Sequence, residues 1–170
     1  MVMRYCEQVN KVAVIIAKAL KKKNISVDID AIDRATLLHD MARAIDFKSF
    51  DPKTTDIPIY LELYKKFGKI DHPRAAAEIL AVEGYPELGK LAEIHRFSDL
   101  PRLKSWEEKI IYYADERVSH DKIVSLQHRF DDLSTRYPQE IKLYSRLRKK
   151  LLQLEKEIFN KLSIKPDDIR

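Results

Sequence analysis

The neighbouring side chains of His39 and Asp40 could together bind a metal ion. Apolar residues recur around this dipeptide at helical spacing: Ile32, Ala35, Leu38 and Ala42. This spacing predicts a helix that runs to about residue 45 and buries one face. Aspartate is unfavourable in the middle of a helix, and neither side chain of the pair is readily buried without a partner. A metal ion would satisfy both, because imidazole nitrogen and carboxylate oxygen are common metal ligands.

Further candidate ligands follow at three places. His72 precedes Pro73, so it is predicted to cap a helix that begins there. His95 ends another predicted helix, where an imidazolium could instead be stabilised by the helix dipole. Asp115 lies within an apolar helix and would be a buried, unpaired carboxylate unless a partner faces it. The second His-Asp copy, His120-Asp121, lies beyond this series and is expected at the surface.

The order of these residues, with their flanking sequences, resembles the HD superfamily of metal-dependent phosphohydrolases over about residues 5 to 120. The resemblance implies that His39, Asp40 and Asp115 hold one ion. It implies that Asp40, His72 and His95 hold a second ion, with Asp40 as the bridge and as a catalytic residue. Mixed histidine and carboxylate ligation favours one or two ions of Fe, Mn, Co, Ni or Zn. Such ions would activate a water molecule for attack on a phosphoester.

The family pattern also contains an earlier histidine, and Tyr5 stands at that position here. Tyr5 could be a phenolate-type ligand, it could leave a coordination position open to water, or it could mark a site that binds metal weakly. Cys6 is adjacent and is expected to face the core or a partner rather than the metal.

Arg43 follows the His-Asp pair by three residues, where the family commonly has a basic residue. It is a candidate for catalysis and for binding a substrate phosphate. A salt bridge between Arg43 and Asp46 or Asp30 is an equally good interpretation. Lys69 and Arg117 are further candidates for phosphate binding.

Composition indicates an intracellular helical protein. The 170 residues suffice for one full core, and only 3 glycines argue for an all-α fold. One cysteine allows no internal disulfide, and no signal peptide or membrane span is recognisable, which predicts a cytoplasmic protein without membrane contact. The net charge of +5 does not by itself imply nucleic acid. Glutamates surround the basic run at residues 146–150, so nucleic acid is not the expected partner.

We therefore expect an HD-type helical bundle over residues 1–120 and C-terminal amphipathic helices over 121–170 that pack on it or on a second subunit as a homo-oligomer. A loop is expected over residues 46–56, a helix from Pro58 to Gly68, and a capping box at Ser105. The expected function is hydrolysis of a phosphomonoester or nucleotide phosphoester, the ligand being a phosphorylated small molecule. The alternative is a catalytically weakened HD scaffold that binds a nucleotide or a protein partner.

Overall fold

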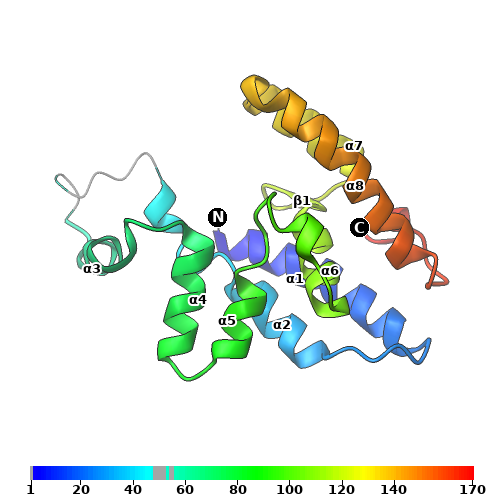
Figure 1. Ribbon diagram of the computed structural model, residues 1–170, viewed down its shortest axis with the longest axis horizontal. Coiled ribbons are helices and arrows are strands. Elements are labelled where there is room, and N and C mark those ends of the chain that lie inside the picture. Colours follow the sequence, from blue (N-terminus) through cyan, green and yellow to red (C-terminus); the bar gives the residue numbers. More distant parts are fainter. Residues whose placement is uncertain (1, 48–52, 54–55) are drawn as a thin grey trace.

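Helix α1 (Val2–Lys21) is the element on which the bundle is assembled. One face of it is buried along its length, at Cys6, Val9, Val12, Ala13, Ile16, Ala17 and Leu20. Helices α2 (Ile29–Leu38) and α6 (Trp106–Asp115) pack against this face. The computed structural model describes residues 2–47, 53 and 56–170, and these residues are all-α apart from one two-stranded hairpin (Figure 1).

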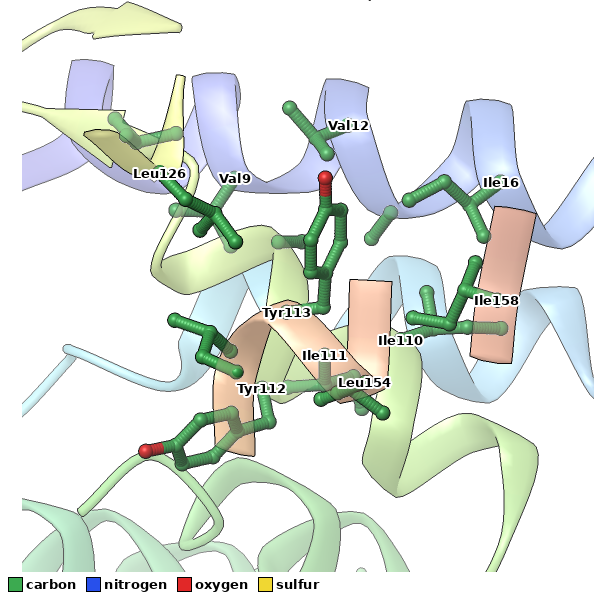
Figure 2. Close-up of a cluster of buried hydrophobic side chains, with 14 of the residues drawn as sticks. Val9, Val12, Ile16, Ile110, Ile111, Tyr112, Tyr113, Leu126, Leu154 and Ile158 are labelled. Atoms are coloured by element: carbon green, nitrogen blue, oxygen red, sulfur yellow. The ribbon is translucent and has the colours of Figure 1, made fainter. Parts of the chain in front are cut away.

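The core between α1 and α6 shows why both helices are apolar on the faces that meet. Figure 2 shows Tyr113 of α6 pointing towards Val12 of α1, whereas Tyr112 points away from α1. Ile158, from the C-terminal part of the chain, lies close to Ile16 in the same view. All of these side chains are buried. Burial of each large apolar side chain contributes about 1.5–3 kcal/mol, so this contact is a main source of stability.

Helices α4 (His72–Val82) and α5 (Pro86–Ala92) form an antiparallel pair, and α5 also packs on α2. Their axes approach so closely that a Cβ placed on Gly89 would lie only 2.7 Å from the carbonyl oxygen of Ala77. Helix α3 (Pro58–Phe67) and the 3-10 helix η1 (Arg43–Asp46) pack beside α4 around a second, smaller core. Residues of η1 and of the start of α4 line the cavity of the site described below.

The C-terminal part begins with a hairpin of β1 (Val118–Ser119) and β2 (Lys122–Ile123), followed by α7 (Leu126–Arg136) and the long α8 (Ile141–Phe159). Short 3-10 helices lie elsewhere, at η2 (Leu100–Arg102), η3 (Pro138–Glu140) and η4 (Pro166–Asp168). Helices α7 and α8 lie together along one side of the bundle (Figure 1). The apolar stripe of α8 belongs to the main core. Homo-oligomerisation through these helices remains a prediction.

Several helix ends differ from the sequence-based expectations. Helix α2 ends at Leu38 rather than near residue 45, because His39 bonds back to the Thr36 carbonyl and the chain turns into η1. Asp71, not His72, caps α4, since its carboxylate accepts a hydrogen bond from the Arg74 N–H at 3.2 Å. Helix α5 ends at Ala92, before His95. The corrected ends place candidate ligands at helix ends rather than within helices.

Other local expectations are confirmed. Helix α3 begins at Pro58 and ends before Gly68, and Ser105 and Glu108 form the expected capping box at the start of α6. Most of the loop expected over residues 46–56 lies outside the described residues. Among the helices that the structure describes, none is both long enough and apolar enough to cross a membrane.

Candidate metal centre

Five candidate metal ligands come together from four helices that are distant in sequence. His39 and Asp40 follow the end of α2, His72 lies in the first turn of α4, His95 follows α5, and Asp115 is the last residue of α6. His39, Asp40, His72 and Asp115 are buried, and the side chain of His95 is only 6% exposed. Burial of so many polar groups is costly unless they bind each other or a cation.

Three of these residues, which we call the Asp40 triad, point their polar atoms at one another: Asp40, His72 and His95. Nε2 of His72 lies 3.0 Å from Oδ1 of Asp40 and 2.9 Å from Nε2 of His95. Nε2 of His95 lies 3.7 Å from the same Asp40 oxygen. In the part of the chain that the structure describes, this is the one group of three or more such residues whose ligand atoms all lie within 4.8 Å of one another.

The outer nitrogen of each histidine ring is held by a hydrogen bond. Nδ1 of His95 donates to the Ala92 carbonyl at 3.0 Å, and Nδ1 of His39 donates to the Thr36 carbonyl at 2.8 Å. Nδ1 of His72 lies 2.5 Å from the Asp46 carboxylate. Because these partners accept, a neutral ring at His72 or His95 carries its proton on Nδ1 and keeps the lone pair on Nε2. This arrangement is typical of histidines that bind a metal through Nε2.

The inner atoms of the Asp40 triad fit a cation. With both rings protonated on Nδ1, the Nε2 lone pairs of His72 and His95 face each other and also face a carboxylate. Such atoms are all acceptors and cannot bond to one another. Buried Oδ1 of Asp40 correspondingly finds no hydrogen-bond partner among the described residues. Nε2 of His72 now accepts a hydrogen bond from Nη1 of Arg43 at 2.8 Å. A divalent transition ion would bind all three atoms together, so the residues present fit the metal that was expected.

The other two candidates, which we call the His39–Asp115 pair, already contact each other. Nε2 of His39 lies 3.2 Å from Oδ1 of Asp115 and 4.0 Å from Oδ2 of Asp40. The Tyr5 hydroxyl donates to the same Asp115 oxygen at 2.7 Å. Tyr5 thus approaches the pair as a hydrogen-bond donor to a candidate ligand, a role that the sequence did not suggest.

The pKa shifts follow these contacts. Burial alone would lower the pKa of His39, but its contact with Asp115 raises that pKa well above the usual value. Burial opposes the ionisation of Asp115, but His39 lowers the pKa of Asp115 overall. The pair is therefore an imidazolium facing a carboxylate. Burial and the charge of Asp115 raise the pKa of Tyr5, which keeps its phenol protonated.

The Asp40 triad has the opposite character. Burial, followed by the charge on His39, lowers the pKa of His95 to about 4, so this imidazole is neutral near pH 7. Burial would raise the pKa of Asp40, but contact with His72 and the charge of His39 lower it overall. The triad thus presents a neutral imidazole and a carboxylate, the ionisation states in which these groups bind metal.

The three candidate phosphate-binding residues lie in different environments. Arg43 lies beside the Asp40 triad, and its Nη1 donates to Nε2 of His72 at 2.8 Å and lies 3.9 Å from Asp40. Asp46, expected as a salt-bridge partner of Arg43, instead contacts His72. Lys69 is exposed after α3 and is not among the described residues that line the cavity at the site.

Arg117 does not serve the site. Its guanidinium is buried, and it donates to the Val124 carbonyl at 2.5 Å, the Tyr113 hydroxyl at 2.6 Å and the Pro166 carbonyl at 3.1 Å. These bonds join α6, the hairpin and the C-terminal segment. The expectation that Arg117 binds phosphate is therefore corrected: its donors are used for packing.

A cavity of about 550 Å³ opens over both groups of ligands. Sequence reasoning missed that α7 lines this cavity, through Arg129, Leu133 and Arg136. Their spacing of four and then three residues places them on one helix face, and this was the available signal. His120, expected at the surface, is exposed but also borders the cavity.

Comparison with known families agrees with this geometry. The family model described as HD domain matches residues 6–119, which leaves α7 and α8 outside the match. Searches of the curated proteins and of the solved structures gave no match. HD domains bind divalent metals and are in general metal-dependent hydrolases. Since the match covers more than half of the 170 residues, this chain belongs to the HD domain family.

Proposed function

We propose that this protein is a phosphohydrolase that cleaves a phosphomonoester or nucleotide phosphoester with the help of a divalent transition metal. The observation that carries the proposal is the Asp40 triad. Two imidazoles expose Nε2 lone pairs to each other and to a buried carboxylate oxygen, and outer hydrogen bonds fix both rings. A site prepared for a ligand in this way differs from an ordinary buried polar cluster, in which donors and acceptors alternate.

Asp40, His72 and His95 would hold one ion of Fe, Mn, Co, Ni or Zn, and His39 and Asp115, with Asp40, would hold a second where two are bound. When bound, such an ion polarises a phosphoryl oxygen and lowers the pKa of a water molecule towards neutrality. The contributions of the chain are to fix the ligands through Thr36, Asp46 and Ala92, and to bury them away from bulk solvent.

Arg43 is the residue that would bind the phosphoryl oxygens. Its side chain is 43% exposed, so it can turn towards a ligand in the cavity. At present it donates to Nε2 of His72, the atom that a metal ion would use. With that atom bound to a metal, Arg43 would be free to make the planar, two-point contact that guanidinium makes with phosphate.

A second candidate function is binding without turnover, and the contact of Tyr5 with Asp115 favours it. The phenol uses an oxygen of the His39–Asp115 pair that a metal would need. A protein that holds one ion but not two could retain a phosphorylated ligand without hydrolysing it.

The proposal is tested by phosphate release from a panel of phosphomonoesters and nucleotides. Chelator-stripped protein is assayed alone and after addition of Fe, Mn, Co, Ni or Zn ions. We expect turnover that depends on added metal and is lost in Asp40→Ala. Binding of a phosphorylated compound without any turnover would support the scaffold instead, and metal-independent turnover would contradict both functions.

A further inference from the structure

Arg129 of α7 is a cationic side chain in the cavity that the proposed function has not used. Its side chain is only 13% exposed, and its buried Nε has no hydrogen-bond partner among the described residues. It pairs with Glu116, whose Oε2 lies 3.6 Å from that nitrogen and is itself without a hydrogen bond in the described part of the chain. This distance is too long for a hydrogen bond, so neither the guanidinium of Arg129 nor the carboxylate of Glu116 is fully satisfied by the other.

Two further arginines that line the cavity are more fully engaged. Arg96 donates two hydrogen bonds to Asp71, at 2.6 and 2.7 Å. Arg136 donates two to Asp132, at 2.6 and 3.1 Å. No comparable hydrogen bond holds the guanidinium of Arg129 within residues 2–47, 53 and 56–170. Arg129 therefore keeps donors available for a ligand, and a buried guanidinium prefers an anionic one.

Arg43 and Arg129 approach the cavity from different elements. Arg43 lies on η1, and η1 and α7 lie on different sides of the start of α1 (Figure 1). Arg43 contacts His72 and Asp40 of the triad, whereas Arg129 pairs with Glu116, next to Asp115 in the chain. The cavity thus has a cationic group near each of the two groups of ligands.

Part of the cavity wall is apolar. Phe97 and Tyr144 meet edge to face with ring centroids 5.6 Å apart, and Leu133 of α7 adds to this surface. A ligand that fills the 550 Å³ would therefore have a body that covers the apolar wall.

We propose that Arg129 binds a second anionic group of the substrate, so that the substrate is a phosphate ester whose leaving group carries another phosphate or a carboxylate. This inference rests on the proposed function for the place of the scissile phosphate at the Asp40 triad and Arg43. It gives α7, which lies outside the family match, the role of selecting the substrate.

The test compares ligand pairs that differ by one phosphate: adenosine 3′,5′-bisphosphate with adenosine 5′-monophosphate, and fructose 1,6-bisphosphate with fructose 6-phosphate. Calorimetry measures their binding to stripped protein, and kcat and KM are measured separately on Mn-loaded protein. We expect the bisphosphate of at least one pair to bind about 10-fold more tightly, as a charge-assisted hydrogen bond provides. Arg129→Gln should reduce that preference to within about 2-fold, at similar affinity for the monophosphate.

Arg136→Gln is the matched control, because it is the same substitution on the same helix and at the same cavity, and it should keep the preference. Glu116→Gln removes the carboxylate that competes for Arg129, so it should increase the preference even if Arg129→Gln folds poorly. Equal binding within both pairs by the wild type, or an unchanged preference in Arg129→Gln or Glu116→Gln, would overturn the inference. If the bisphosphate binds more tightly in a way that depends on Arg129 but no substrate is turned over, the inference about Arg129 stands and the proposed phosphohydrolase activity is rejected.

Discussion

The Asp40 triad and the His39–Asp115 pair share one cavity but differ in what satisfies their inner atoms. In the triad, acceptors face acceptors, and Oδ1 of Asp40 has no hydrogen-bond partner in the described part of the chain. In the pair, an imidazolium faces a carboxylate at 3.2 Å, and the Tyr5 hydroxyl donates to the same oxygen at 2.7 Å. The triad is prepared for a cation. The pair has its own charge compensation, although Nε2 of His39 also makes no hydrogen bond among the described residues.

The difference shows that candidate ligands of the same residue types need not be equally available. An ion held by the triad would take the place of the hydrogen bond from Arg43 to His72. An ion held by the pair would require His39 to lose a proton and would compete with the hydrogen bond from Tyr5 to Asp115. We therefore expect the two positions to fill in order, the triad first, and four predictions test this account of the two positions.

The largest effect is expected from Asp40→Ala. Asp40 contacts His72 and His95 through Oδ1 and lies near His39 through Oδ2, so its loss should weaken both metal positions. Loss of groups that merely orient ligands costs about 10–100-fold in metal affinity, so loss of a shared ligand should cost at least about 100-fold. Elemental analysis after equilibrium dialysis measures this. Asp121→Ala, in the exposed second His-Asp copy, should keep its metal; equal loss in the two variants would refute the assignment.

A matched pair of histidine substitutions should separate the two positions. His95→Gln should lower the affinity of the Asp40 triad for its metal, the first ion to bind, by about 10-fold or more. His39→Gln should change that affinity by less than about 3-fold. Metal titration, not thermal stability, is the readout, since removing one partner of a buried ion pair costs about 3–5 kcal/mol by itself. Equal weakening of the first ion by the two changes would show that the positions are not distinct.

The pH dependence of the two binding steps should also differ. The raised pKa of His39 keeps it protonated near neutral pH, so an ion bound there must release a proton, and its affinity should rise with pH. The pKa of His95 is about 4, so His95 needs no deprotonation between pH 6 and 8. Calorimetry in buffers of different ionisation enthalpy should show about one proton released by the second ion and fewer by the first. The reverse order would mean that the pair fills first.

The sequence predicted those parts of the fold that are determined by local signals. The apolar stripe of α1, the start of α3 at Pro58 and the capping box at Ser105 each depend on a few neighbouring residues. The resemblance to the HD superfamily also identified residues that converge on one site. The predictions of local structure succeeded because helical periodicity and capping are properties of short segments, whereas the role of the converging residues as metal ligands stays a prediction.

What the sequence could not give depends on contacts between distant segments. The ends of α2 and α5 lie at the candidate ligands, where side chains bond to carbonyls of their own helices and the chain turns towards the cavity. Nothing in the sequence around Arg117 indicates that its N–H groups donate to the carbonyls of Val124 and Pro166. Tyr5 was recognised as a departure, but its bond to Asp115 spans 110 residues and follows only from the packing of α1 against α6.

The smallest effect, and the most specific, is expected at Tyr5. Tyr5→Phe keeps the ring but removes the donor to Asp115, so the second ion should bind about 3-fold more tightly and the first should be unaffected. Tyr5→His places an imidazole at the same start of α1 and should strengthen the second ion further, though modestly, because no partner is prepared to orient the new ring. Metal titration of stripped wild type and both variants measures these differences. If neither variant changes the affinity for the second ion, Tyr5 does not limit metal binding at the His39–Asp115 pair. The order of filling is then set by the proton on His39 alone. If Tyr5→His instead raises the affinity of the Asp40 triad for the first ion, the new ring reaches the triad. The two metal positions are then not separate, as the present geometry indicates that they are.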